Sequence, residues 1–517
     1  MLTLMPSSWS IEKIVEVMGT TTYMARLAIN LEADKGILSI PEKKMGHGLS
    51  VEVSSAVINF YNDDEMSSPM PGKKDFVSLR NDDGTKIQIE KRLVLCNLKE
   101  LHKIFQSRFP GIKIGFSSFA SLRPKHCILA GGSGTHTVCV CSIHQNVKLM
   151  ILGGKLSRLT EGSNMPLKTY SDCVNAIICD NPKTECYFNT CLNCPGIDNI
   201  KQLIFTEMDN HAIDEIRYKQ WVSTPKVTLE TTLKNASDFV DDFCDKLVGL
   251  LPHNFIAKEQ SAYLRALKES ITDNEFIVIV DFAENYAFIV QNAAPGFHWN
   301  NDQATVYTVV IYYKVNNQLT HQSMVIISDC LNHDSIAVHV YSGIIFDFIK
   351  SLSPTVSKVF FFSDGAPQQY KNYKHFSNLS HYREDFGVPV EWNFFATAHG
   401  KGPCDGVGGT VKMRASRASL QLPPDEQILT PVQFFEWVSK NLTNINVRFS
   451  TVDAYNLMKD KLEDRFKNAK TIPATQKIHK ISPLEDGIVE VKSFSFSDQS
   501  LTHSTVKKRR QSLSKKK

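Results

Sequence analysis

Two aspartates stand where a folded sheet would gather carboxylates. Asp281 lies within the apolar run EFIVIVDFAENYAFIV, residues 275–290, and Asp364 follows the apolar run SKVFFF that begins at residue 357. Both runs are rich in β-branched and aromatic residues, which predicts strands. Carboxylates are the ligands that Mg²⁺ or Mn²⁺ prefers. Two such ions about 3.5–4 Å apart promote in-line displacement at phosphorus. The pair therefore predicts a two-metal phosphoryl-transfer site.

The elements predicted around these acids would bring them together. Residues 275–420 read as strand, strand, strand, helix, strand, helix, strand and helix, which is the order of the ribonuclease-H fold. A right-handed crossover would set the fourth strand parallel to the first and beside it. We therefore expect an α/β ribonuclease-H-like core with a mixed five-stranded sheet, in which Asp281 and Asp364 are neighbours.

The chemistry also needs a third carboxylate. Asp405, at the mouth of the last predicted helix, lies where this fold supplies one, although the glycines at 406, 408 and 409 are poor helix formers. Glu284 on the first strand is the competing choice, and Glu391 is a weaker one. An aspartate at the end of a strand or the start of a helix is also a common turn former or cap, so each acid has a structural alternative. Other residues that could approach phosphate or DNA are His399, Lys401 and the run from Gln368 to Asn372.

Cysteines and a histidine form a second group with chemical potential. Eight of the twelve cysteines lie between Cys127 and Cys194. Tetrahedral zinc takes four thiolate or imidazole ligands. We expect at least one structural zinc, Zn²⁺, and the most economical site joins two of Cys139, Cys141 and His144 to Cys191 and Cys194. Cys127, Cys173, Cys179 and Cys186 remain for a second ion. The alternative is that these cysteines are small buried hydrophobic residues.

The N-terminal region predicts a helix pair. Residues 11–18 and 21–35 have apolar side chains at helical spacing, on either side of Gly19. Glycine tolerates the positive φ of a tight turn, and Thr20 or Thr21 can cap the second helix. The pattern resembles a helix-turn-helix, whose second helix enters the DNA major groove. Any antiparallel helical hairpin would give a similar pattern.

Length and composition predict several soluble domains. The chain has 517 residues, 42% hydrophobic and 22% charged, and no apolar run long enough to span a membrane. The net charge of +4 is small, but basic residues crowd the last eleven positions, as in a nuclear-import or phosphate-contacting tail. We expect six regions: a helix-turn-helix-like region (1–115), a Cys/His-rich zinc region (116–195), a helical connector (196–274), the catalytic core (275–420), a helical region (421–480) and a disordered basic tail (481–517).

Six short motifs carry a resemblance to a known family. They are MPGKKD at Met70, LRPKHC at Leu122, CVCSIHQN at Cys139, DFAENY at Asp281, FSDGAPQQYKN at Phe362 and HGKGPCDGVGG at His399. With these, most of residues 2–420 resembles the eukaryotic cut-and-paste DDE/D transposases, in particular a widespread transposon-derived family of animal genomes.

The resemblance implies a function as well as a fold. It implies that Asp281, Asp364 and Asp405 are the first, second and third catalytic acids. It further implies Mg²⁺ or Mn²⁺ as cofactor, double-stranded DNA as partner, a possible homo-oligomer on DNA, and the nucleus as location. Two alternatives are a domesticated, inactive DNA-binding protein and a ribonuclease-H-like nuclease.

Overall fold

The structure is a computed structural model. It describes residues 2–6, 8–40, 49–63, 66–69, 76–80, 86–94, 97–129, 141–223, 226–291, 301–400, 402–423, 425–485 and 487–507. The chain divides into two compact units, one of residues 1–59 with 105–122 and the other of residues 60–104 with 123–517.

The first unit contains the helix pair expected at the N-terminus. Helix α1 spans Ile11–Met18 and α2 spans Thr22–Lys35. Gly19 ends α1 with a φ of 59°, and the Thr21 side chain accepts a hydrogen bond from the Met24 N–H at the start of α2. The glycine turn and threonine cap were both predicted. Within this unit Met24 is exposed, and α2 instead buries small residues, Ala25 and Ala28.

Further short helices and strands lie between residues 51 and 129. The helices there are α3 (Val51–Asn62), α4 (Leu98–Arg108) and α5 (Phe116–Ser121). Strand β1 (Ser67–Pro69) pairs with β4 (Arg92–Val94), and β4 pairs with β5 (Cys127–Leu129). Strands β2 (Phe76–Arg80) and β3 (Lys86–Glu90) form an antiparallel pair. The motif MPGKKD lies outside the described residues.

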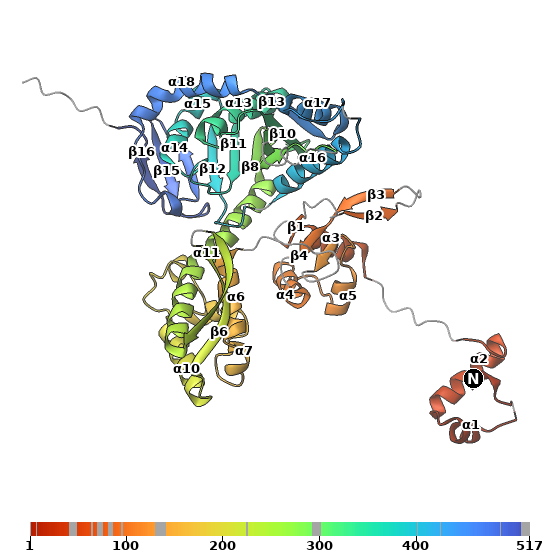
Figure 1. Cartoon of the computed structure of the whole chain (residues 1–517). Helices are drawn as coiled ribbons and strands as arrows, with labels where there is room; N and C mark the ends of the chain where they lie inside the picture. The colour runs from red at the N-terminus through yellow and green to blue at the C-terminus, as the bar shows by residue number, and fades with distance from the viewer. Residues whose placement is uncertain are drawn as a thin grey trace, which may run out of the picture. The chain divides into compact units, whose positions relative to one another are not determined.

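A helical module with its own core precedes the large sheet. Its elements are α6 (Ser142–Gly153), α7 (Leu156–Leu159), α8 (Tyr170–Ile177), α9 (Thr184–Tyr187), α10 (Asp198–Asn210), β6 (Glu215–Ser223), β7 (Val227–Asn235) and α11 (Ala236–Ser270). The connector expected to be mostly helical at 196–274 thus contains a β-hairpin. The sequence missed it because β6 alternates charged residues with only two fully buried ones, Ile216 and Tyr218. Helix α11 runs from this module to the sheet (Figure 1).

A nine-stranded mixed sheet forms the centre of the second unit. Its strands are β8 (Glu275–Ala287), β9 (Gln303–Val315), β10 (Gln318–Ser328), β11 (Lys358–Ser363), β12 (Val390–Phe394), β13 (Ile445–Ser450), β14 (Lys480–Pro483), β15 (Ile488–Lys492) and β16 (Leu501–Ser504). Their order is β13-β10-β9-β8-β11-β12-β14-β15-β16. As predicted, β11 is parallel to β8 and beside it. Asn316 and Asn317 both have positive φ in the turn between β9 and β10.

Four strands were not expected. The prediction of five strands was wrong because β13 adds to β10 at one edge and β14–β16 add beyond β12 at the other. The stretch expected to be a disordered tail from residue 481 therefore contains most of β14 and all of β15 and β16, and the basic residues from 508 onward lie outside the described residues. These strands are short, and few of their side chains are buried, Ile481, Val489 and Val491 among them, so the alternating pattern was weak.

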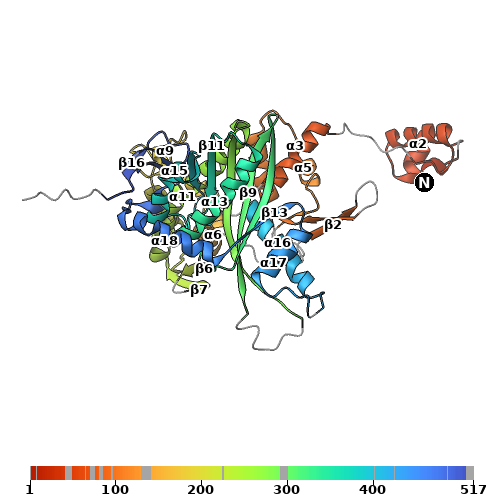
Figure 2. The ribbon, with the colours of Figure 1, turned by 90° about the horizontal axis from the view of Figure 1, so that it is seen from above.

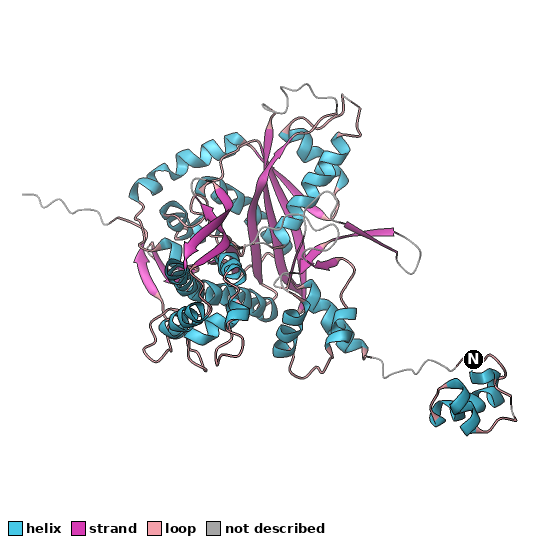
Figure 3. Cartoon of the chain, turned by 60° about the horizontal axis from the view of Figure 1, so that its bottom comes forward, coloured by secondary structure: helices cyan, strands magenta, loops and turns pink. Residues whose placement is uncertain are grey.

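Helices cover both faces of the sheet (Figures 2 and 3). Even-numbered β8 residues such as Val278 pack with α13 (Ser335–Leu352), α14 (Tyr373–Leu379), α15 (Tyr382–Phe386) and α18 (Val452–Asn468). Odd-numbered residues such as Ile277 and Ile279 pack with the end of α11 and the start of α16 (Pro403–Ser419), and α17 (Pro431–Asn441) continues that layer. Burial on both faces explains why the central strands are almost continuously apolar.

Helix α13 is apolar and long enough, by length and composition, to cross a membrane, with a hydropathy of 1.3 over its 18 residues. Eleven of its side chains are buried, among them Val338, Tyr341 and Ile345, which pack against the sheet. We therefore assign α13 as a core helix of the second unit.

Candidate functional site

Asp281 and Asp364 lie on the same face of neighbouring parallel strands. The register pairs Phe360 with Ile277 and Phe362 with Ile279, and continuing it two residues beyond the paired stretch would set Asp364, just after β11, opposite Asp281. Side chains alternate along a strand, which sends both aspartates to the face that carries Ile279 and Phe362. Asp364 follows the last residue of β11 and is partly exposed, like Asp281. The structure thus brings together two acids that are 83 positions apart in the sequence.

Asp405 reaches this face from the first turn of α16. Its carboxylate accepts a hydrogen bond from the Gly402 N–H at 2.9 Å, which closes the start of the helix. The preceding residue, Cys404, is buried, and its thiol donates to the Ile279 carbonyl of β8 at 3.3 Å. The charge of Asp405 is one of the causes, after burial and the charge of Asp364, that raise the pKa of Asp281, so Asp405 lies near Asp281.

The glycines after Asp405 do not prevent the helix. Helix α16 runs through all three glycines, and the surroundings of Gly408 show why a glycine is needed at that position. A Cβ at Gly408 would stand 3.1 Å from Ala283 Cβ and 3.2 Å from Thr308 Cγ2. The missing side chain therefore lets α16 approach β8 and β9 closely enough to hold Asp405 over the sheet.

The electrostatics of the acids follow from their burial. Burial raises the pKa of Asp281 to about 8, and the charges of Asp364 and Asp405 act in the same direction. Burial also raises the pKa of Asp364, against the Ala366 N–H that donates to it and the charge of Lys371. Half-buried carboxylates that repel one another are what a divalent cation relieves. Among the described residues, however, the groups whose ligand atoms all lie within 4.8 Å of one another are made of Cys and His, and these acids are not among them.

Lys371 is a polar neighbour of Asp364. The sequence placed it only in a run that could approach DNA and gave it no role beside Asp364. Its side chain is 4% exposed, and its Nζ donates to the Gln476 carbonyl at 3.1 Å. Burial lowers the pKa of Lys371 to about 8, while the charge of Asp364 opposes that shift. A Cβ at Gly365 would stand 3.0 Å from Lys371 Cε, so the glycine after Asp364 leaves room for the lysine stem.

The two other acids considered for the third position have different surroundings. Glu391 is 3% exposed and bound by Lys358, Lys480 and the Tyr263 hydroxyl at 2.6–3.1 Å. The Glu391 carboxylate is therefore already bound by two lysines and a tyrosine hydroxyl. Glu284 is exposed, and Lys412 contacts its backbone carbonyl at 2.9 Å. Glu284 remains an open alternative to Asp405.

Four residues from three segments form a Cys/His cluster. Cys141, His144, His253 and His399 each place one ligand atom within 4.8 Å of all the others. The centroids of the three imidazole rings are 5.1 Å apart in every pair. Burial lowers the pKa of His253 to about 4 and of His399 to about 3, and it also lowers that of His144. The rings are therefore neutral near pH 7, which is the form that binds a metal.

Four cysteines form a second cluster, in the loops around α9. Cys179, Cys186, Cys191 and Cys194 place their sulfurs within 4.8 Å of one another. The Cys179 sulfur lies 3.7 Å from that of Cys194 and 3.9 Å from that of Cys191. The Lys183 N–H donates to the Cys186 sulfur and is the main reason why the pKa of Cys186 is lowered to about 7. Both clusters could hold a structural metal such as zinc.

The expected grouping of ligands differs from the one observed. Cys141 and His144 are separated from Cys191 and Cys194, so these four do not form one site, and Cys179 and Cys186 join the CxxC pair instead. Cys127 and Cys173 are buried elsewhere as free thiols, and Cys139 lies outside the described residues. His253 and His399 were missed as members of a Cys/His cluster because the sequence separates them from Cys141 by more than 100 residues. The run CxxH at 141–144 was the available signal.

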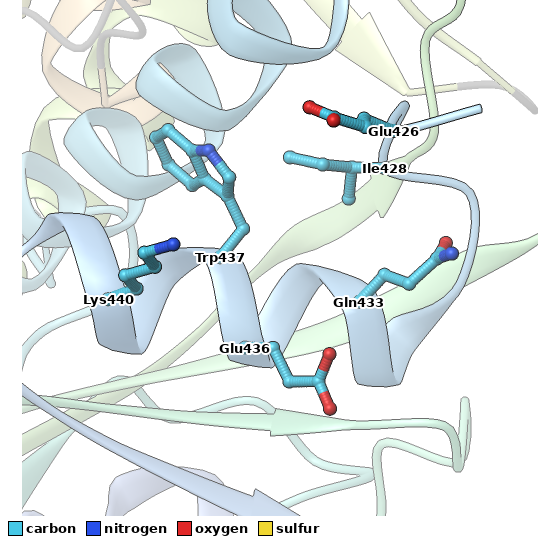
Figure 4. A pocket seen from close by; sticks show the side chains of 6 residues that line it. All are labelled: Glu426, Ile428, Gln433, Glu436, Trp437 and Lys440. Carbon is cyan, nitrogen blue, oxygen red and sulfur yellow. The ribbon is translucent and has the colours of Figure 1, made fainter. Parts of the chain in front are cut away.

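The remaining sequence candidates lie near the acids or outside the described residues. Gly400 and Gly402 of the HGKG motif border Asp364 and Asp405, while Lys401 lies outside the described residues. Gln368 is exposed after β11. A separate hollow beside α17, drawn in Figure 4, contains none of the three acids. Its lining residues are Glu426, Ile428, Gln433, Glu436, Trp437 and Lys440.

Three family models match the chain. Residues 48–131 match a domain of unknown function (DUF8699), residues 142–251 match a second (DUF8700) and residues 260–495 match a third (DUF8701). No curated protein sequence matches the chain. The third model contains all three aspartates. The junction between the second and third falls inside α11, which is continuous there and carries His253.

Proposed function

We propose that the chain is a transposon-encoded or transposon-derived DDE/D transposase that cleaves and joins double-stranded DNA. The observation that carries this proposal is the placement of Asp281 and Asp364 on one face of adjacent parallel strands. The order β10-β9-β8-β11-β12 within residues 275–420 supports the proposal, because it is the strand order expected of a ribonuclease-H-like core, and the resemblance of the six motifs points the same way.

Asp281 and Asp364 would hold the divalent cations, and Asp405 would add the third carboxylate from α16. When bound there, Mg²⁺ or Mn²⁺ would activate the attacking oxygen and stabilise the leaving oxygen. Lys371 acts as a positioning residue, because its buried charge lies beside Asp364. The Ala366 and Gly402 N–H groups fix the orientation of the second and third carboxylates.

The remaining parts of the chain fit a nuclear DNA-binding protein. The pair α1 and α2 is a helix-turn-helix candidate for reading the element ends, and the basic residues after Asp498 suit nuclear import or phosphate contacts. Transposition brings two DNA ends together, so a homo-oligomer on DNA is expected. The four-cysteine cluster is proposed as a structural zinc site, because four thiolates are a complete tetrahedral ligand set.

A domesticated, inactive DNA-binding protein is the second candidate. The observation that favours it is local: Asp364 accepts from the Ala366 N–H and Asp405 from the Gly402 N–H, which are the contacts of an ordinary turn former and helix cap. Those contacts use one oxygen of each carboxylate and leave the other for a cation.

The test is a cleavage assay with a duplex that ends in the DNA flanking the gene. The wild-type chain is compared with Asp281→Asn and with Glu275→Gln, which changes the carboxylate at the first residue of β8. We expect nicking that needs Mg²⁺ or Mn²⁺, that is lost in Asp281→Asn and that is retained in Glu275→Gln. Salt-sensitive DNA binding without cleavage by the wild type would favour the second candidate. Cleavage of RNA paired to DNA, but not of the duplex, would favour a ribonuclease-H-like nuclease.

A further inference from the structure

The cluster of Cys141, His144, His253 and His399 joins three separate segments. Cys141 is the N-cap of α6, and His144 lies in the first turn of that helix, on the same side of it. His253 belongs to α11, and its Nε2 lies 3.2 Å from the Cys141 sulfur. His399 comes from the loop between β12 and α16. One thiolate and three imidazoles offer four protein ligands of the types that zinc takes, the number that fills its tetrahedral coordination at a structural site.

Two nitrogens in the cluster are buried without a hydrogen-bond partner. These are Nδ1 of His144 and Nε2 of His399, each unpartnered among the described residues. An orphaned buried polar atom is costly unless something binds it. The other nitrogen of His144, Nε2, lies 3.2 Å from Asn254 Oδ1. A donated Nε2–H leaves the Nδ1 lone pair free for a metal, and such outer partners are typical of zinc-binding histidines.

We propose that Cys141, His144, His253 and His399 bind one zinc ion that fastens the loop of residues 396–402 to α6 and α11. Tetrahedral ligands about 2.0–2.3 Å from zinc lie somewhat closer together than 4.8 Å, so small side-chain movements complete the site. The ion thereby links the helical module to the sheet at the loop that leads to Asp405.

The loop forms one wall of the acid site. Ala398 has a φ of 61°, a conformation that non-glycine residues rarely adopt, and the next residue is the ligand His399. A Cβ at Gly400 would stand 3.0 Å from Asp364 Cβ, so the loop passes directly over that acid. Gly402 then donates its N–H to Asp405. A metal bound at His399 is therefore one residue from contact with Asp364 and three residues from the group that orients Asp405.

Helix α11 does not need the metal to reach the sheet. The Gln260 amide donates to the carbonyls of Phe394 and His479, each at 3.0 Å, and its oxygen accepts from the Ser495 N–H at 2.8 Å. These buried contacts hold α11 in place two turns after His253. The element that zinc would immobilise is thus the loop at 396–402, and α6 and α11 act as the fixed support.

Zinc content tests the site without any reference to DNA cleavage. The purified full chain, prepared with zinc and without chelator, is compared with His253→Ala, with Asn254→Ala and with Cys194→Ser. We expect two zinc ions per wild-type chain and one each in His253→Ala and Cys194→Ser. Asn254→Ala keeps every ligand, and it should weaken one of the two zinc sites by about 10–100-fold in a chelator competition.

Hydrogen–deuterium exchange then tests the fastening of the loop. Amides of residues 396–402 should exchange about tenfold faster or more in His253→Ala than in the wild type, but at the wild-type rate in Cys194→Ser. If His253→Ala retains the zinc content of the wild type, the site is refuted. If it loses one zinc but the loop exchanges as before, the fastening is refuted. Should His253→Ala not fold, the same two measurements on Asn254→Ala, with zinc titrated below saturation, decide both points.

Discussion

Asp281 on β8 lies close to Asp364, the residue that follows the neighbouring parallel strand β11, and burial together with the charge of Asp364 raises the pKa of Asp281. Two half-buried carboxylates placed in this way repel each other unless a cation or a proton lies between them. The proposed activity depends on this proximity of the two carboxylates. From it we predict how substitutions of Asp281 and of neighbouring residues change stability and cleavage.

Asp281→Asn should stabilise the protein at pH 7 when no divalent cation is present, because burial and the charges of Asp364 and Asp405 disfavour the ionised form of Asp281 in the folded chain. We expect the free energy of unfolding in EDTA to rise by roughly 1–3 kcal/mol, since each pKa unit corresponds to about 1.4 kcal/mol. Mg²⁺ or Mn²⁺ should raise the melting temperature of the wild type and leave that of the variant unchanged. Denaturation with and without metal measures both effects. A variant that is less stable than the wild type in EDTA would indicate a purely structural aspartate.

Asp405→Asn and Glu284→Gln distinguish the two candidates for the third acid. We expect Asp405→Asn to abolish metal-dependent strand cleavage with little effect on fold or DNA binding, since losing one metal ligand affects the transition state more than the scaffold. Glu284→Gln should cleave normally. Both variants are assayed for cleavage and binding in one buffer. The opposite pattern would move the third acid to β8.

Gly408→Ala should destabilise the fold through the contact between α16 and the sheet. The added methyl group would stand 3.1–3.2 Å from Ala283 and Thr308, and overpacking of this kind costs about 1–3 kcal/mol. Gly249→Ala in α11 is the matched control. It has open space around it and should instead gain up to about 1 kcal/mol from helix propensity. Urea unfolding of the two variants checks the difference, and equal effects would show that α16 is not closely packed.

Cys194→Ser should remove zinc from the four-cysteine cluster and destabilise the helical module. Structural thiolates contribute folding energy only when metal is bound. Cys173→Ser is the control, because Cys173 is a buried free thiol of the same module outside both clusters. Metal analysis should show one zinc fewer in Cys194→Ser and an unchanged content in Cys173→Ser. If the wild type holds less than about half an equivalent of zinc and its thiols titrate freely, no structural zinc is bound.

His375 makes the core sensitive to acid. Its ring is fully buried, and neither of its nitrogens has a hydrogen-bond partner among the described residues. Burial lowers the pKa of His375 to about 3. As pH falls below the unfolded value of 6.5, the unfolded chain gains a proton that the folded chain does not, so stability is lost between pH 6.5 and about 3.

The corresponding experiment replaces the imidazole of His375 by a ring that cannot take up a proton. His375→Phe should reduce the slope of stability against pH between 6 and 4 by up to about 1.4 kcal/mol per pH unit, because one proton no longer separates the two states. His211→Asn, at an exposed histidine, is the control and should keep the wild-type slope. An unchanged slope in His375→Phe would mean that the ring is protonated in the folded protein.

The sequence predicted the parts of the fold that local patterns determine. The parallel pairing of the strands around Asp281 and Asp364 followed from long apolar runs and the handedness of crossovers. The turn at Gly19 and the cap at Thr21 followed from residue type. The edge strands β14–β16 did not, because short strands with few buried residues have little periodicity.

The sequence predicted which residue types form the candidate metal sites, but it did not predict which residues come together in each site. The sequence indicated Cys141 and His144 as zinc ligands, and the cysteines at 186–194 as well. It could not indicate His253 and His399, because only the tertiary fold brings α11 and the loop after β12 to the start of α6. It also treated the glycines after Asp405 as an obstacle to a helix, whereas Gly408 serves the approach of that helix to β8.

The most direct test of the account is to locate bound Mn²⁺ in crystals of the wild-type chain by its anomalous scattering. The account predicts a peak between the carboxylates of Asp281 and Asp364 that is absent from crystals of Asp281→Asn. Mn²⁺ bound elsewhere on the protein with no peak between these two aspartates would contradict it.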